Sequence, residues 1–251
     1  MSAIGSADFF LPSRGVLYGG KVPEGKVVIR DMTAKEHLLL AEAGGGILGK
    51  LSAVLNACVQ LPEGSVKLSN LLVPDRMALL LALRTRTFGP KYTMSWKCPE
   101  CEARNKSEID IARDLNERTP KEGLVEPFEV TLPHGKNVVS LRFLRGDDEE
   151  TVMRSAKSMQ AQSTDGLDKS MLIRVALQIV AIDGAEQANT LVKLSFVERL
   201  HSADLFAIQD AIEAVEPGID TSVHLTCPKC EADSKLQMSF TPEFFRPRVR
   251  N

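Results

Sequence analysis

Two stretches decide the fold of this chain: Trp96-Lys97-Cys98-Pro99-Glu100-Cys101-Glu102-Ala103 and Leu225-Thr226-Cys227-Pro228-Lys229-Cys230-Glu231-Ala232. Each contains the pattern C-P-x-C-E-A, and together they hold four of the five cysteines. Alternating residues on either side indicate a strand that enters each turn and a strand that leaves it. We therefore expect two knuckle hairpins, each of which aims two thiolates at one point.

The cysteines of these turns are candidate ligands of a single metal ion: Cys98, Cys101, Cys227 and Cys230. Four cysteines complete a tetrahedral site, so the predicted Zn²⁺ is structural rather than catalytic. The alternatives are free thiols, redox-active pairs or an iron–sulfur site. A redox pair would open a helix after a strand, whereas strand-like residues follow both pairs. Hairpin knuckles favour zinc over iron–sulfur.

The composition is that of an ordinary globular protein, with 43% hydrophobic and 25% charged residues in a chain of 251. A net charge of −2 gives no general attraction to nucleic acid or to an anionic membrane. We expect no secretory signal and no membrane span, because the apolar runs are too short. Cysteines arranged in this way indicate a reducing compartment.

The remaining pattern predicts an α+β protein in which helical bundle segments accompany a zinc-ribbon-like pair of knuckle hairpins and one further β-hairpin. The expected strands are residues 26–30, 92–97, 107–111, 222–226 and 235–240, with the further hairpin at 128–132 and 138–144. One expected helix begins at Thr33 in a capping box. Further helices are expected over residues 47–59, 76–86, 147–159 and 167–182, and Asp75 is expected to cap the second of these. A last helix is capped by Ser202 and reaches Val215. Residues 113–126 have the composition of a linker.

These elements predict three regions. Residues 1–90 form an N-terminal arm and helices. Residues 91–112 and 221–241 together form a discontinuous zinc-knuckle module. Residues 125–220 form an inserted hairpin and helical region. The apolar stretch from Phe9 to Gly20 is interrupted by proline and glycine and is expected to lie as an arm across another surface.

No catalytic group of residues stands out. Cys58 is expected to be a small buried apolar residue on a helix, and the four histidines are dispersed. The segment Gly44 to Leu51 nearly matches a phosphate-binding loop, and Ile179-Val180-Ala181-Ile182-Asp183 could supply the acid of such an enzyme. The loop lacks its final Ser or Thr and follows a helical pattern, so a glycine break between two helices is favoured.

A zinc-ribbon module that binds nucleic acid is the alternative function. The paired knuckles and the basic tail Arg246-Pro247-Arg248-Val249-Arg250 support it. Mixed charges around the knuckles and an aromatic content of 5% argue against it. A solvated tail, or one that docks onto an acidic protein, fits the composition better.

A series of motifs resembles one known family. In order, they are Phe10-Leu11-Pro12-Ser13-Arg14-Gly15-Val16-Leu17-Tyr18, Ile29-Arg30-Asp31-Met32-Thr33-Ala34-Lys35-Glu36, Asp75-Arg76 with Leu79 to Arg84, Phe88-Gly89-Pro90-Lys91-Tyr92 and the first C-P-x-C. This order resembles the baseplate hub assembly proteins of T-even-type contractile-tailed bacteriophages. The resemblance covers residues 9–112 and the second knuckle, and residues 113–220 only in general layout.

The resemblance implies a non-enzymatic structural or assembly protein of a phage tail baseplate hub. The implied partners are other phage tail and baseplate hub proteins, with the tape-measure protein among the candidates. It also implies assembly in the host cytoplasm and a place in the virion tail baseplate. It carries over no catalytic residues, and family members do not all retain the cysteines, so the zinc prediction rests on this sequence.

Overall fold

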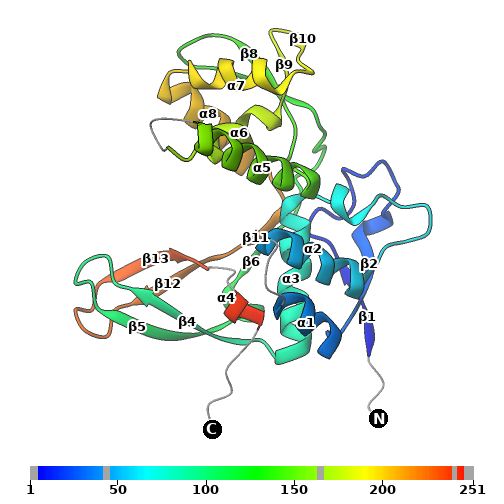
Figure 1. Ribbon diagram of the computed structural model, residues 1–251, viewed down its shortest axis with the longest axis vertical. Helices are drawn as coiled ribbons and strands as arrows, with labels where there is room; N and C mark the ends of the chain where they lie inside the picture. Colours follow the sequence, from blue (N-terminus) through cyan, green and yellow to red (C-terminus); the bar gives the residue numbers. More distant parts are fainter. Residues whose placement is uncertain (1–4, 42–45, 163–166, 239–241, 246–251) are drawn as a thin grey trace.

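The computed structural model of the protein describes residues 5–41, 46–162, 167–238 and 242–245. Over these residues the chain is an α+β protein with eight α-helices and five small antiparallel sheets, as predicted. Two bodies lie one above the other in Figure 1, and a pair of long hairpins projects to one side. None of the helices in the described ranges is long and apolar enough to cross a bilayer.

The lower body of Figure 1 is built on a sheet in the order β1-β2-β3. Its elements are β1 (Ser6–Phe10), η1 (Pro23–Gly25), β2 (Lys26–Arg30), α1 (Ala34–Ala41), α2 (Ile47–Cys58), β3 (Val59–Gln60), η2 (Leu68–Asn70) and α3 (Val73–Phe88). The strand predicted at residues 26–30 is confirmed. The capping box is confirmed as well, because Thr33 Oγ1 accepts the Lys35 N–H and the Glu36 carboxylate accepts the Thr33 N–H.

The segment between β1 and β2 was predicted to lie across another surface, and that surface belongs to its own chain. Ser13 and Tyr18 are buried, and both donate to the Asp75 carboxylate, with Oγ–Oδ2 and OH–Oδ2 distances of 2.5 Å. Asp75 had been expected to cap a helix that starts at Arg76. Instead α3 begins at Val73 with Pro74 in its first turn, a position that proline suits, and Asp75 is a buried acceptor inside the helix.

Two long hairpins form the projecting part of the molecule. Their strands are β4 (Lys91–Lys97) with β5 (Arg104–Asp110), and β12 (Ser222–Thr226) with β13 (Asp233–Gln237). Strand β13 begins earlier than predicted, and Ser239 and Phe240, its predicted end, lie outside the described residues. After β5 come α4 (Ile111–Asp114) and β6 (Asn116–Arg118), and β6 pairs with β11 (Gly218–Asp220). The linker prediction for 113–126 is therefore wrong at its start. Residues 113 and 114 end helix α4, and residues 116–118 form a strand through pairing with the distant β11.

The upper body contains a sheet in the order β10-β9-β8-β7. Its elements are β7 (Phe128–Thr131), β8 (Val138–Leu141), α5 (Gly146–Gln162), α6 (Ser170–Gln178), β9 (Ile179–Ile182), β10 (Ala185–Glu186), α7 (Thr190–Glu198) and α8 (Ser202–Glu213). The last described element, η3 (Pro242–Phe245), lies outside this body and packs beside Tyr92 and Arg84. The predicted helix over 167–182 is confirmed for Ser170–Gln178 and wrong for its last four residues, which pair with β8 as β9. The cap of α8 is His201, whose Nδ1 accepts the Ala203 N–H, rather than Ser202.

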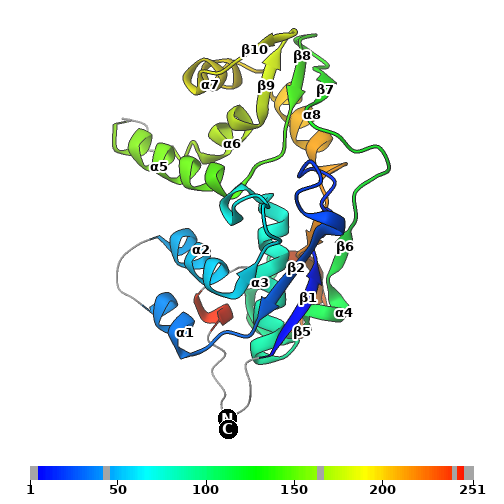
Figure 2. The same cartoon turned by 90° about the vertical axis from the view of Figure 1, so that its right-hand side faces the viewer.

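The same order of elements occurs twice along the chain. The first series is β1, β2, α1, α2, β3, α3 and the β4–β5 hairpin, and the second is β7, β8, α5, α6, β9, α8 and the β12–β13 hairpin, with β10 and α7 added. One constant offset in residue number relates Val73 through Cys101 to Ser202 through Cys230. Figure 2 shows the strands of each series beside their own helices.

The repeated elements also repeat their buried contacts. Arg30 donates to the carboxylate of Glu36, six residues later, and to the Asp31 carbonyl. Arg142 donates to the carboxylate of Asp148, again six residues later, and to the Phe143 carbonyl. Shared sequence pattern, shared topology and shared contacts together establish that the two halves are two versions of one structural unit.

Candidate metal centre

The two knuckle turns have the same backbone conformation. The Cys98 N–H donates to the Ala103 carbonyl and the Cys227 N–H to the Ala232 carbonyl, both at 2.9 Å. Glu102 and Glu231 lie in the left-handed region with φ of 58° and 59°. Their N–H groups donate back to the carbonyls of the first cysteines, Cys98 and Cys227. Each turn is thus closed by two hydrogen bonds that hold both of its thiols on one side.

The four sulfur atoms lie at the distances that a tetrahedral metal site requires. All of them lie within 4.8 Å of one another, and the Sγ–Sγ distances are 3.7 Å for Cys98 with Cys230 and for Cys101 with Cys227. Thiolates about 2.3 Å from a zinc ion form a tetrahedron with edges of about 3.8 Å. A disulfide would need about 2.05 Å. Cysteines from two hairpins far apart in the chain, with Cys101 and Cys227 separated by 126 positions, therefore form a cluster whose dimensions fit a single ion.

Burial of the cluster is symmetric between the hairpins. The first cysteine of each turn, Cys98 or Cys227, is buried, whereas Cys101 is partly exposed and Cys230 is exposed. Desolvation opposes ionisation of Cys227, but the N–H groups of Lys229 and Cys230 outweigh it and lower the pKa of Cys227 to about 6.

The pKa of Cys230 is shifted in the opposite direction. The Ala232 N–H favours its thiolate, but the neighbouring cysteines Cys101, Cys227 and Cys98 raise the pKa of Cys230 to about 12. Thiolates packed this closely repel one another, and a divalent cation removes that repulsion as the protons leave. The donor set and its electrostatics therefore fit a cation with soft ligands.

A polar side chain outside the ligand set supports one sulfur. Asn105 Nδ2 donates to Cys227 Sγ at 3.5 Å and to the Ala103 carbonyl at 3.3 Å. The equivalent residue of the second hairpin is Ser234, whose buried Oγ has no hydrogen-bond partner among the described residues. Sequence reasoning missed Asn105. The duplicated C-P-x-C-E-A pattern could have pointed to it, since Asn105 lies two residues beyond the repeat.

Other sequence candidates lie outside this centre. Cys58 is buried in α2, as predicted, and desolvation raises its pKa to about 11. His134 and His201, far apart in sequence, stack with ring centroids 4.2 Å apart. Asp204 binds backbone N–H groups beside them, so their arrangement closes a loop onto α8. Among the described residues, the cysteine cluster is the group of His, Cys, Asp or Glu with metal-binding geometry.

The near match to a phosphate-binding loop does not have the required structure. Residues 44 and 45 lie outside the described residues, but the element before the glycines is helix α1, and Ile47 to Lys50 already belong to α2. A phosphate-binding loop follows a strand. Ile179–Ile182 is indeed a strand, contrary to its helical prediction, but Asp183 at its end binds Asn137 and the Val138 N–H.

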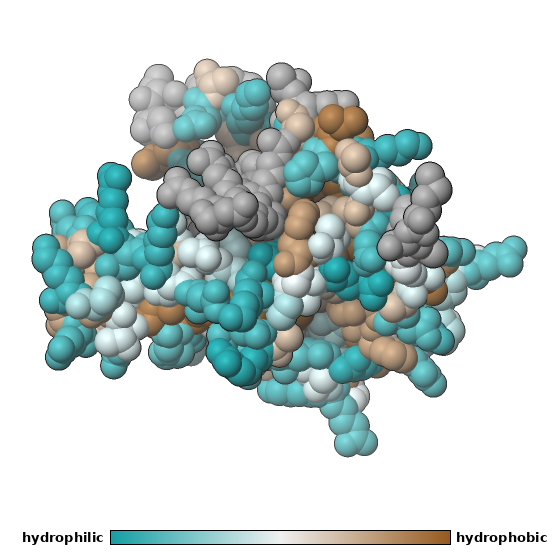
Figure 3. Space-filling view, turned by 90° about the horizontal axis from the view of Figure 1, so that it is seen from below, coloured by the Kyte–Doolittle hydropathy of each residue, from teal (hydrophilic) through white to brown (hydrophobic). Residues whose placement is uncertain are grey.

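The outside of the hairpin pair carries paired charges. Lys91 and Lys97 lie 2.7 and 3.1 Å from carboxylates of Glu108 and Glu102. Seen from below, the projecting hairpins carry mostly hydrophilic residues (Figure 3).

Comparison with known proteins identifies the family of the chain. No curated protein and no solved structure shows significant similarity to it. A family model described as T4 bacteriophage base plate protein matches residues 17–246. Since the match covers most of the chain, with both knuckles and the motifs from Ile29 onward, the chain belongs to the T4 bacteriophage base plate protein family.

Proposed function

We propose that this protein is a non-enzymatic structural or assembly component of the hub of a phage tail baseplate. The observation that carries the proposal is the family match over residues 17–246, which spans both halves of the fold. The hub assignment within the family rests on the ordered motifs from Phe10 to Cys101. The proposed partners are other tail and hub proteins, including the tape-measure protein, met during assembly in the host cytoplasm.

We also propose that Cys98, Cys101, Cys227 and Cys230 bind one structural Zn²⁺. The supports are the Sγ–Sγ distances of 3.7 Å and the shared knuckle conformation. Because all four positions of the ion would be filled by protein, the ion would hold the hairpins together and would not act on a substrate. Zinc would then stabilise the segment between the knuckles by closing a long loop.

The proposed division of labour follows the regions expected from sequence. Residues 1–90 and 125–220 would present surfaces to partners, and the discontinuous module of 91–112 and 221–241 would fix those surfaces relative to one another. The two bodies also meet directly, since Val73 N–H donates to the Leu144 carbonyl and Gly146 N–H to the Leu71 carbonyl. The module would therefore reinforce an interface that the bodies already share.

The test is assembly in infected cells. An amber mutation in the gene should stop baseplate formation, and the wild-type chain supplied from a plasmid should restore it. Crosslinking followed by mass spectrometry should join the chain to other hub proteins. Complete tails assembled without the chain would refute the proposal. Salt-dependent binding of DNA or RNA by the purified chain, with normal tails in its absence, would establish the nucleic-acid alternative instead.

A further inference from the structure

In the upper body, the side of strand β8 that faces β9 is fully paired by the chain itself. Val139 pairs with Ile182 of β9, and just beyond it the Asp183 N–H donates to the Val138 carbonyl at 2.7 Å. The Asp183 carboxylate accepts the Val138 N–H in return, at 2.8 Å. The strand edge is therefore covered up to the loop that follows β7.

In the lower body, the equivalent edge of β2 has no pairing strand beyond Val28 among the described residues. Strand β3 pairs only with Val28 and Ile29 of β2, through Gln60 and Val59. If this register continued, Pro62 would lie opposite Lys26. The equivalent pair in the upper body is Asp183 opposite Val138. Proline has no N–H, so Pro62 cannot donate to the Lys26 carbonyl as Asp183 does to that of Val138.

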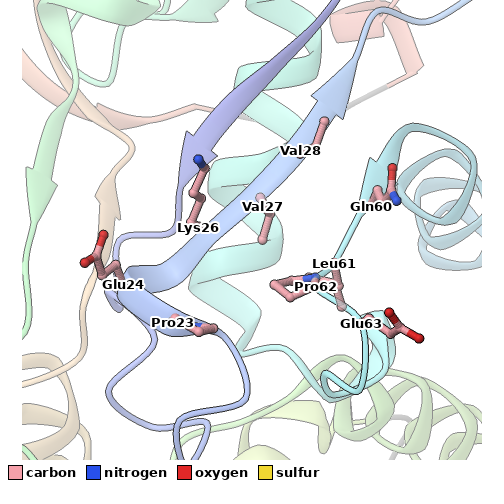
Figure 4. Close-up of a pocket in the computed structure, with 9 residues that line it drawn as sticks. All are labelled: Pro23, Glu24, Lys26, Val27, Val28, Gln60, Leu61, Pro62 and Glu63. Carbon is pink, nitrogen blue, oxygen red and sulfur yellow. The ribbon is translucent and has the colours of Figure 1, made fainter.

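A groove of about 520 Å³ lies where the chain leaves this edge. Its apolar lining comes from Val27, Val28, Leu61 and Pro62. Figure 4 shows β2 on one side and the segment after β3 on the other, with Glu24 and Glu63 on opposite sides of the opening.

The rim of the groove is acidic. The one cation that lines it, Lys26, is neutralised by Asp8, whose Oδ2 lies 2.7 Å from Nζ. Within the described ranges, Glu24 and Glu63 are exposed and form no ion pair. An apolar slot between two carboxylates favours an extended guest that combines apolar and basic side chains.

One segment of this chain has that chemistry. Arg246, Arg248 and Arg250 alternate with Pro247 and Val249. In an extended segment the arginines would share one face and Pro247 and Val249 the other, and Pro247 favours extended backbone at the residue before it. These residues lie outside the described part of the structure.

The groove of the same molecule is too far for this segment. Phe244, just before it, packs within 5.6 Å of the Arg84 guanidinium near the C-terminal end of α3. The groove adjoins the loop that binds Asp75 at the opposite end of that helix. The Arg84 guanidinium donates to the Lys91 carbonyl beyond the end of α3, and the thirteen residue steps from Asp75 to Phe88 span about 20 Å of helix. Arg246 is two residues from Phe244 and lies at most about 7 Å from it, so the segment as a whole cannot lie in the groove of its own molecule.

We propose that the groove beside β2 in one copy binds the Arg246–Arg250 segment of a second copy. The arginines meet Glu24 and Glu63, Val249 enters the apolar slot, and a backbone N–H of the segment donates to the Lys26 carbonyl. The contact is heterologous, because the groove of one copy meets the tail of the next, and such contacts build rings or open arrays.

The first experiment measures binding of a fluorescein-labelled peptide, Arg-Pro-Arg-Val-Arg-Asn, to the full-length protein by fluorescence anisotropy. The double variant Glu24→Lys, Glu63→Lys should weaken binding by about tenfold or more. The control pair Glu122→Lys, Glu186→Lys makes the same charge change at exposed positions away from the groove and should leave binding unchanged. Equal weakening by both pairs, or no saturable binding, would overturn the proposal.

The second experiment asks whether the occupant is another copy. In sedimentation velocity the wild-type chain should associate with rising concentration, and Arg246→Glu, Arg248→Glu, Arg250→Glu should abolish association. Mixing that variant with Glu24→Lys, Glu63→Lys should restore association, because the arginine tail of the second variant meets the unchanged groove of the first, and the glutamate tail of the first meets the lysines of the second. Peptide binding without self-association at any concentration would reject the second copy as the occupant.

Discussion

Asp75 and Asp204 occupy the third position of equivalent helices, α3 and α8, and each accepts the backbone N–H of the residue that follows a Leu-Pro pair. The donors are Ser13 N, at 3.0 Å, and His134 N, at 2.7 Å. Both carboxylates are fully buried. Each aspartate thus fastens the loop of its own β-hairpin to the start of a helix, and the two halves share this buried polar contact.

Replacing either aspartate by asparagine should release only the loop of its own unit. Asp75→Asn substitutes an NH₂ group for an acceptor of the Ser13 and Tyr18 protons, which should lower the free energy of unfolding by about 1–3 kcal/mol. Hydrogen exchange should rise in residues 11–25 and not in 132–137, and Asp204→Asn should do the reverse. The control is Asp210→Asn, an exposed position on α8. Faster exchange in both loops from either substitution would contradict this picture.

The knuckle hairpins could be predicted from sequence because the necessary information is local. Two cysteines, a proline and flanking alternation specify strand, turn and strand within about a dozen residues. The strand at 26–30 and the capping box at Thr33 are local in the same sense. The family motifs added the expectation of a baseplate protein, and the family match bears this out.

Other features depend on residues far apart in the chain. Asp75 has the sequence of a helix cap, but its partners are 57 and 62 residues away, so its burial could not be predicted. Ile173 to Ile182 is apolar enough for helix or strand, and only pairing with β8 makes its last part a strand. The repeat of the whole unit is hidden by a long loop between β1 and β2 and by the added α7.

Metal removal should loosen the projecting hairpins. The purified chain is expected to contain one zinc ion per molecule by mass spectrometry, and a strong chelator should remove it and lower the melting temperature. Cys227→Ser should bind no zinc and melt like the chelated protein, because a structural site can contribute on the order of 10 kcal/mol. Cys58→Ala should keep its zinc, since Cys58 is buried in α2. Unchanged melting after complete chelation would show that no metal stabilises the fold.

The ion pair of Arg30 with Glu36 should make the lower body sensitive to acid. The Arg30 hydrogen bond lowers the pKa of Glu36 from 4.5 to about 2. A depressed carboxyl pKa stabilises the folded state fully above about pH 4.5, and this stabilisation is lost as the pH falls toward 2. Urea unfolding of Glu36→Gln should show a loss of about 3 kcal/mol at most at pH 7. Its stability should also fall less steeply than that of the wild type between pH 4.5 and 2. Parallel pH curves for the two proteins would contradict the assignment.

Glu216 should have the opposite effect at neutral pH. Desolvation by burial, reinforced by Glu213 and Asp75 and opposed by Arg118 and Arg174, raises the pKa of Glu216 from 4.5 to about 7. A raised carboxyl pKa means that folding favours the protonated form, so stability declines as the pH rises from about 4.5 to about 7. Glu216→Gln keeps a neutral side chain at every pH. The variant should therefore melt at a higher temperature than the wild type at pH 8 and at a similar temperature at pH 4.

The control for this prediction is Glu213→Gln, an exposed neighbour 3.9 Å from Arg118. It removes one negative charge from the same region but leaves the half-buried Glu216 carboxyl in place. Differential scanning calorimetry of the three proteins between pH 4 and 8 separates the two effects. If Glu213→Gln raises the melting temperature at pH 8 as much as Glu216→Gln does, the cause is the general charge of this region, and burial of Glu216 is not the source of the pH dependence.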